Sequence, residues 1–129
     1  MPAGDLFTSD QRRAIDKART QASADADLDF HVFVGAMEGD PRSEAQRLHI
    51  ALPAAARAVL VVVDPRARAL EIVTGGEARR VLDDATCGLA ALSMRTAFAA
   101  GDLAGGIVRG LHQLGDHARR PTTLHTDPP

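Results

Sequence analysis

The sequence contains no tryptophan and no tyrosine, and its only aromatic side chains are four phenylalanines. Proteins that bind single-stranded nucleic acid usually stack bases on such rings, so this composition disfavours that class. The 15 basic residues face 17 acidic ones, which gives a formal net charge of −2. Because the chain lacks a basic field, we expect no nucleic-acid partner and no anionic membrane partner.

Cysteine is nearly absent, since Cys87 is the only one in the chain. A single thiol excludes an intramolecular disulfide and a cysteine-based zinc site. The longest apolar run, residues 58–63, is far shorter than the roughly 20 residues that cross a bilayer. The first residues also lack the pattern of a signal peptide. We therefore expect a cytoplasmic protein without membrane insertion.

The hydrophobic periodicity predicts helices and strands in the order α-β-α-β-β-α-α. A capping box at Thr8 and Gln11 starts a helix over about 9–23, and residues 23–27 form a polar break. Further helices are expected after Asp40, after Asp83 or Asp84, and after Asp102. In the third helix, the core stripe is predicted at four positions, namely Ala85, Leu89, Leu92 and Phe98.

Three strands are expected at residues 28–35, 58–63 and 69–73. The run 58–63 is continuous and β-branched, which is typical of a central strand buried on both faces. A crossover helix makes 28–35 parallel to it, and the turn at residues 64–66 makes 69–73 antiparallel. The prediction is an α/β fold, a three-layer α/β/α sandwich with a small mixed sheet. This single domain would span residues 8–118, between a flexible N-terminus (1–7) and a disordered proline-rich tail (119–129).

Several short motifs follow one another in an order typical of one family. They include the strand and turn of residues 59–66, the strand 70–72, the turn 75–77, the helix start 81–85 and the segment 98–107. Together with the helix start at residues 7–9, they resemble the TPM domain, the family of thylakoid-lumen photosystem-repair proteins and their bacterial relatives. The resemblance covers most of residues 6–117. The matching positions are Arg66, Gly75, Glu77, Leu82, Asp84, Ala85, Phe98, Gly101, Asp102 and Gly105 or Gly106.

This resemblance implies an α/β/α sandwich. Some members of the family are described as binding divalent metals or as acid phosphatases, and others serve as partners in assembly or repair. Two departures indicate a degenerate member: Ala56-Arg57-Ala58 replaces the family's Asp-Asn-Gly, and Val73 replaces the first glycine of its tight turn, so we expect an altered loop there. The signal peptide and C-terminal membrane helix of many relatives are also missing, so we expect a soluble member of actinobacterial type. We therefore predict a non-enzymatic interaction or assembly module that binds a protein partner or self-associates. The alternative is a metal-dependent acid phosphatase.

The candidate site residues each have a structural alternative, and no catalytic residue is predicted. The acidic candidates could converge as oxygen ligands for Ca²⁺ or Mg²⁺, or they could cap helices and open a turn. Arg66 and Arg68 could bind an anion, or they could mark the solvated face of an edge strand. Cys87 could have a lowered pKa near a helix N-terminus, or it could be a buried inert thiol. The histidines lack metal-binding spacing, and no cofactor is expected outside the phosphatase alternative. The acidic candidates are Asp64, Glu77, Asp83, Asp84 and Asp102.

Overall fold

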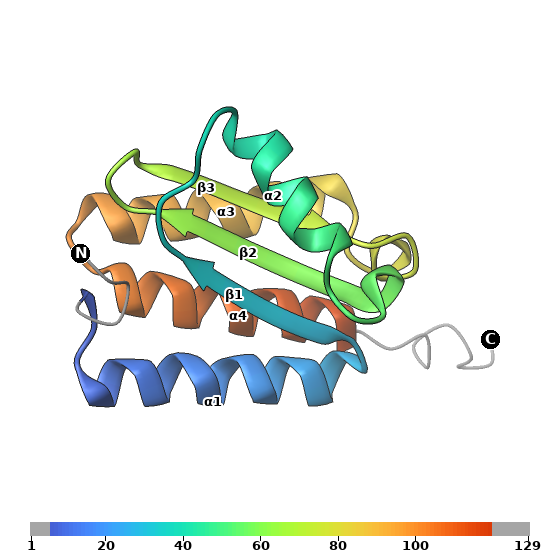
Figure 1. The fold of residues 1–129 in the computed structure, drawn as a ribbon. Coiled ribbons are helices and arrows are strands. Elements are labelled where there is room, and N and C mark those ends of the chain that lie inside the picture. Colours follow the sequence, from blue (N-terminus) through green and yellow to red (C-terminus); the bar gives the residue numbers. More distant parts are fainter. Residues whose placement is uncertain (1–5, 120–129) are drawn as a thin grey trace.

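The helices and strands occur in the order predicted from the sequence (Figure 1). The structure is a computed structural model that describes residues 6–119. Residues 1–5 and 120–129, where most of the flexible N-terminus and the proline-rich tail were expected, lie outside the described residues. The elements are α1 (Ser9–Ala26), β1 (Asp29–Val34), α2 (Pro41–Ile50), η2 (Ala55–Arg57), β2 (Ala58–Asp64), β3 (Ala69–Thr74), η3 (Ala78–Arg80), α3 (Asp84–Ala99) and α4 (Leu103–Arg119).

The sheet has the strand order β1-β2-β3 with β2 in the centre. β1 runs parallel to β2, with Asp29 opposite Ala58, and β3 runs antiparallel to β2, with Asp64 opposite Ala69. All seven residues of β2 are buried. The predicted mixed sheet and its central strand are therefore confirmed.

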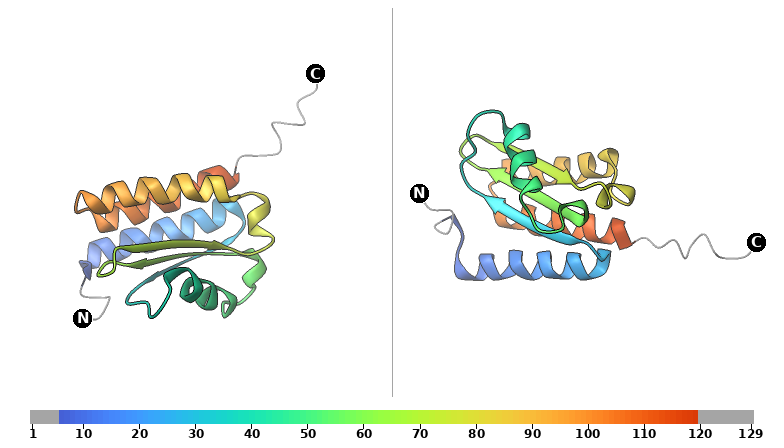
Figure 2. Two further views of the ribbon diagram at one scale, coloured as in Figure 1. Left: turned by 90° about the horizontal axis from the view of Figure 1, so that it is seen from above. Right: turned by 45° about the vertical axis from the view of Figure 1, so that its right-hand side comes forward.

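Helices cover both faces of this sheet, so the molecule has three layers (Figure 2). On one face, α1, α3 and α4 enclose a core that includes Val59, Val61 and Val63 of β2. On the other face, α2 packs against β2 and β3, where it covers Leu60 and Val62. Because α2 does not extend over β1, Phe33 on that face remains 37% exposed.

The first helix follows the predicted start but ends later than predicted. The Thr8 hydroxyl accepts from the Gln11 backbone N–H, and the Gln11 side chain accepts from the Thr8 N–H, which completes the capping box. The helix continues through the expected polar break to Ala26. Ala22 is buried against Gly115 of α4, where a glycine leaves room for the close approach. This packing, with the high helix propensity of the alanines, prolongs the helix until Asp27 adopts a left-handed φ of 55°.

The predicted core stripe of α3 is wrong for three of its four positions. Ala85, Leu89 and Leu92 face away from the core, and Phe98 alone packs against it. The buried residues of α3 are Ala90, Met94 and Ala97. The cause lies in α4: a side chain at Gly110 would lie 2.4 Å from the Met94 sulfur, and one at Gly106 would lie 2.7 Å from the Phe98 ring. Met94 and Phe98 pack into the space that these glycines leave. The side of α3 that carries them therefore faces the core, and Leu89 and Leu92 face solvent.

Candidate functional site

Asp64, a predicted metal ligand, ends β2 and has its carboxylate engaged by backbone groups. One oxygen accepts from the Met37 N–H at 2.9 Å, and the other accepts from the Arg66 and Ala67 N–H groups at 3.2 Å each. These hydrogen bonds, with the Met37 bond contributing most, hold the Asp64 pKa below its ordinary value. Asp64 therefore joins the loop after β1 to the turn after β2, which is the structural alternative considered above.

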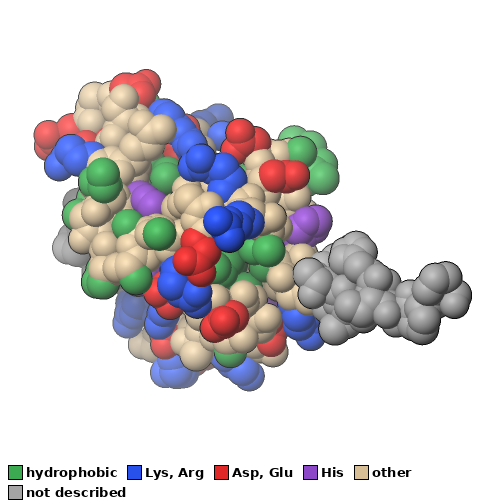
Figure 3. Space-filling model, turned by 90° about the vertical axis from the view of Figure 1, so that its right-hand side faces the viewer, with side chains coloured by type: hydrophobic (Ala, Val, Ile, Leu, Met, Phe, Trp, Pro, Cys, Tyr) green, Lys and Arg blue, Asp and Glu red, His purple; other side chains and the backbone are tan. Residues whose placement is uncertain are grey.

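Glu77 lies at the opposite end of β2, where it pairs with Arg57. The Arg57 guanidinium donates to the Glu77 carboxylate at 2.7 Å and lies 3.4 Å from the Asp27 carboxylate. It also donates to the main-chain oxygen of Asp27. Figure 3 shows this end of the molecule, where acidic and basic side chains alternate without a continuous patch of one sign. A cation of the protein itself thus occupies the position between the two carboxylates.

The remaining acidic candidates belong to helix starts. Asp83 accepts from the Thr86 N–H at 2.9 Å, and this bond lowers the Asp83 pKa. Asp84 lies in the first turn of α3. Asp102 accepts from the Gly105 N–H at 2.9 Å. The five candidates are thus divided between different ends of the sheet and different helices. Within residues 6–119, no three His, Cys, Asp or Glu side chains form a group that could hold a metal ion.

The two predicted anion-binding arginines lie in the turn between β2 and β3. Both are exposed, and neither belongs to an edge strand, so that structural alternative for them is wrong. Arg68 adopts a left-handed φ of 54°, which is uncommon for a side chain of this size.

Cys87 and a histidine that the sequence did not single out are both structural. Burial, followed by the charges of Asp84 and Asp83, raises the Cys87 pKa to about 11. The lowered pKa considered above is therefore wrong, and a raised pKa favours the protonated, unreactive thiol at neutral pH. His49 of α2 is 8% exposed, and its Nε2 lies 2.9 Å from the main-chain oxygen of Ala58. This bond fixes α2 to the start of β2.

The exposed side of α3 is the strongest candidate for a functional surface. Leu89 is 64% exposed and Leu92 is 62% exposed, one helical turn apart. A hollow beside Leu92 is lined by Arg109 of α4, and a second hollow beside Leu89 is lined by Asp116 of α4. We call Leu89, Leu92, Arg109 and Asp116 the α3 face. Sequence periodicity missed this surface because leucines at helical spacing usually indicate a core.

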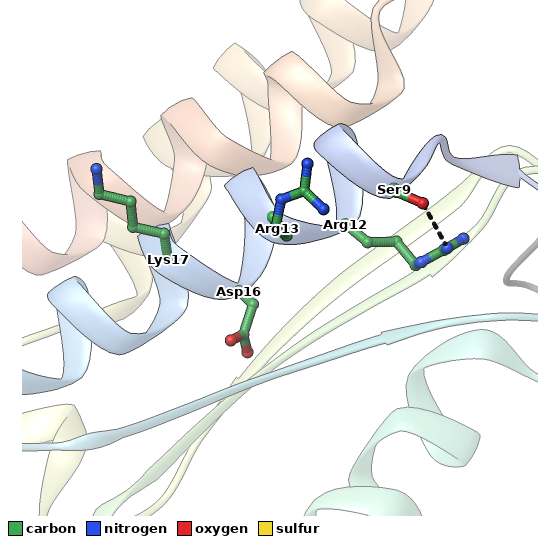
Figure 4. Close-up of a pocket in the computed structure, with 5 residues that line it drawn as sticks. All are labelled: Ser9, Arg12, Arg13, Asp16 and Lys17. Carbon is green, nitrogen blue, oxygen red and sulfur yellow. Dashed lines mark hydrogen bonds between the residues drawn. The ribbon is translucent and has the colours of Figure 1, made fainter.

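A hollow on α1 is a weaker candidate. Figure 4 shows that its side chains project in different directions along one helix, and only Ser9 and Arg12 are joined by a hydrogen bond. The Asp16 carboxylate forms an ion pair of 2.7 Å with the Arg19 guanidinium. Such a solvated helix surface does not converge on a ligand. The lining residues are Ser9, Arg12, Arg13, Asp16 and Lys17.

One family of known sequences matches nearly the whole chain. The family described as "Domain of unknown function (DUF5130)" matches residues 2–115. The chain belongs to this family. Among curated relatives, the uncharacterized protein Rv2468c of Mycobacterium tuberculosis is 27% identical over 101 residues. That alignment covers 78% of this DUF5130 chain and 60% of the relative, so the chain spans about 60% of the length of the relative it matches.

Solved structures share the fold of this DUF5130 chain. The NMR structure of the BA42 protein from Bizionia argentinensis superposes with a TM-score of 0.77 at 18% identity, covering 91% of this chain and 84% of that one. The N-terminal domain of the cg2496 protein from Corynebacterium glutamicum gives a TM-score of 0.76 at 19% identity, covering 90% of this chain and 76% of that one. At such identities, the similarity concerns the fold alone.

Within residues 6–119, no helix is both long enough and apolar enough to span a bilayer.

Proposed function

We propose that this chain is a degenerate TPM-type domain that acts as a non-enzymatic interaction module and self-associates through the α3 face. The observation that carries the proposal is the exposure of Leu89 and Leu92, at 64% and 62%, on one side of one helix. Leaving two adjacent leucines in water forgoes about 1.5–3 kcal/mol of burial for each side chain. A second copy of the chain that covered them would recover part of this free energy.

The charges around the leucines favour a second copy as the occupant. Arg109 lies beside Leu92 and Asp116 lies beside Leu89, so a basic and an acidic group flank the pair on opposite sides. If a two-fold axis passes between Leu89 and Leu92, perpendicular to α3, the α3 helices of the two copies are antiparallel. Arg109 of each copy then lies beside Asp116 of the other. An arrangement in which a patch complements itself is what a two-fold dimer requires.

Both charged groups are accessible for such a contact. Arg109 lies 3.5 Å from Asp102 and Asp116 lies 3.3 Å from Arg119, and all four side chains are more than half exposed. Exposed ion pairs of this kind contribute little, so exchanging them across an interface costs little. The apolar area offered by two leucines is small, and we expect a weak dimer that forms at high micromolar concentration.

Sedimentation velocity of the full chain over a range of concentrations tests the proposal. The expected result is a reversible monomer–dimer equilibrium that the double variant Leu89→Glu/Leu92→Glu abolishes. Ile50→Glu is the matched control, because Ile50 is 76% exposed on α2, in the opposite layer of the molecule. It should dimerise like the original chain.

A charge exchange tests the predicted orientation. Arg109→Glu alone and Asp116→Arg alone should each weaken association, and the two substitutions together should restore it, because the pair across the interface is re-formed with reversed sign. A chain that stays monomeric at millimolar concentration, or a leucine variant that dimerises normally, would overturn the proposal.

The phosphatase alternative receives no support from the described residues. A metal-dependent phosphatase holds its ion with several oxygen ligands. Here Asp64 is engaged by three backbone N–H groups, and Glu77 is paired with Arg57. These two acidic groups therefore already have partners within the fold.

A further inference from the structure

A cleft of about 460 Å³ is lined by residues of the β2–β3 turn and of the α3–α4 turn. Both turns lie at the left-hand end of the molecule in Figure 1. The cleft is separate from the α3 face and from the Arg57–Glu77 pair. Its walls are mostly apolar and are formed by Val63 and Leu70 of the strands and by Phe98 and Leu103 of the helices. This volume falls within the range of small-molecule sites.

Two arginines from different elements line this cleft. Arg68 comes from the β2–β3 turn, and Arg95 comes from α3. Arg95 donates one hydrogen bond of 3.0 Å to the main-chain oxygen of Leu70, which anchors the side chain and leaves other N–H groups available. Within residues 6–119, neither Arg68 nor Arg95 pairs with a carboxylate, which is also true of Arg66, Arg79 and Arg80.

The backbone at Arg68 indicates that this side chain is present for a reason other than stability. Its φ of 54° lies in the left-handed region, where glycine or asparagine is ordinarily found at the end of a turn. An arginine in this conformation destabilises the fold relative to glycine. Strained residues of this kind concentrate at binding sites, where the side chain is needed.

The charge of the cleft defines the class of ligand. Two guanidinium groups and the Asp64 carboxylate give a net charge of +1 among the ionisable residues that line it. The three backbone N–H groups that donate to Asp64 lower its pKa and keep it ionised, so it has no proton to donate to a ligand. A ligand with one negative charge neutralises this net charge of +1. A phosphate dianion would leave one negative charge uncompensated, and it would also be repelled by the Asp64 carboxylate. Carboxylates also match the planar geometry of guanidinium.

We propose that the cleft binds a single carboxylate carried on an apolar chain, with Arg68 and Arg95 holding the carboxylate and Phe98 and Leu103 covering the chain. This chemistry is shared by fatty acids and by peptides that end in an apolar residue. The proposal does not depend on self-association, because the Leu89→Glu/Leu92→Glu variant leaves the cleft intact.

Titration of the full-length ¹⁵N-labelled chain, followed by amide NMR spectra, tests this site. Octanoate should shift amides of residues 64–70 and 95–103, and octanamide, which has the same chain without the charge, should not. Octyl phosphate should bind more weakly than octanoate. N-acetylated peptides that end in leucine, as the free acid and as the amide, distinguish a peptide terminus from a fatty acid as the better ligand.

Variants then separate binding from stability. Arg68→Gly should weaken octanoate binding at least tenfold, while the melting temperature stays the same or rises, because glycine relieves the left-handed strain. Arg95→Gln should also weaken binding. Arg80→Gln, at an exposed arginine of η3 outside the cleft, is the control and should bind normally. Equal binding of octanoate and octanamide, tighter binding of octyl phosphate, or unchanged binding by Arg68→Gly would overturn the proposal.

Discussion

The guanidinium of Arg57 donates a hydrogen bond of 2.7 Å to the carboxylate of Glu77, two residues that lie 20 positions apart in the sequence. A second bond from the same side chain reaches the main-chain oxygen of Asp27. One cation therefore connects the end of α1, the start of β2 and the segment after β3. Relative to the TPM family that the chain resembles, Ala56 and Arg57 stand where an acid and an amide precede the central strand. A positively charged side chain thus stands where those relatives have oxygen ligands.

We predict that this cation prevents specific binding of a divalent ion. At a separation of about 6 Å and an effective dielectric constant of about 20, an unpaired positive charge would oppose a doubly charged ion by roughly 5 kcal/mol. Glu77 and Asp27 offset most of the Arg57 charge, so the main obstacle is that Arg57 already engages their carboxylate oxygens. Calorimetric titration with Ca²⁺, Mg²⁺ and Mn²⁺ should show no specific binding below the millimolar range. Hydrolysis of p-nitrophenyl phosphate between pH 4 and 8 should not exceed that of buffer.

A matched variant shows whether Arg57 is the cause. Ala56→Asp/Arg57→Asn introduces the acid and the amide and removes the charge, so it should bind Ca²⁺ more tightly than the original chain. Micromolar binding of Ca²⁺ by the original chain would contradict the prediction, as would phosphatase turnover that disappears in Asp84→Ala or Asp64→Ala.

The orientation of α3 predicts that alanine substitutions at Met94 and Leu92 change the free energy of unfolding to very different extents. Met94 is fully buried against Gly110, so Met94→Ala should lower the free energy of unfolding by about 2–5 kcal/mol. Leu92 is 62% exposed, and Leu92→Ala should change it by less than about 0.5 kcal/mol. Urea unfolding at a protein concentration where the chain is monomeric measures both. If Leu92→Ala lowered the free energy of unfolding strongly and Met94→Ala only slightly, Leu92 would face the core, as the hydrophobic periodicity predicts, and the observed orientation of α3 would be wrong.

The contrast between these residues shows what the sequence could and could not predict. Element order, strand pairing and caps follow from local signals, such as the apolar run 58–63 and the hydroxyl of Thr8, and these predictions are confirmed. The facing of α3 depends on where α4 places Gly106 and Gly110, which is a tertiary property. The cleft escaped prediction for the same reason: Arg68 and Arg95 lie 27 positions apart and line one cleft only after folding.

The raised Cys87 pKa predicts a thiol that reacts slowly in the folded protein. With a pKa of about 11, only about one thousandth of the thiol is ionised at pH 8, and the thiolate is the reactive form. The rate of labelling by dithiobis(nitrobenzoic acid) should therefore lie far below that of free cysteine and should keep rising with pH beyond 9. Unfolding in guanidinium chloride is the control and should restore the ordinary rate. A native rate equal to that of free cysteine would show that the thiol is not protected.

Asp64 predicts a stability contribution that depends on pH. Its pKa is lowered in the folded state, so the carboxylate stabilises the fold above the ordinary value of 3.8, and this contribution is lost as the pH falls through the lowered value. Asp64→Asn weakens three hydrogen bonds to the charged form and should cost about 2 kcal/mol at pH 7. The gap in unfolding free energy should narrow steadily as the pH falls from 4 to 2. Asp29→Asn, at an exposed position in β1, is the control and should cost little at either pH.

Two adjacent glycines after β3 provide the sharpest test of the close contact that supports the Arg57–Glu77 pair. A Cβ at Gly75 would lie 2.0 Å from the backbone oxygen of Ala55, whereas a Cβ at Gly76 would meet nothing within 4 Å. The resemblance placed Val73 at the first glycine of this turn and predicted an altered loop, yet the close approach is present at Gly75.

Gly75→Ala should therefore lower the free energy of unfolding by about 3 kcal/mol, because backbone atoms rather than a flexible side chain must move. Gly76→Ala should leave it unchanged or raise it by up to about 1 kcal/mol through the reduced entropy of the unfolded chain. Thermal unfolding of the two variants at the same concentration measures the difference. Equal melting temperatures would mean that the segment after β3 does not cross η2 at this distance, and the geometry of the Arg57–Glu77 pair would then be wrong as well.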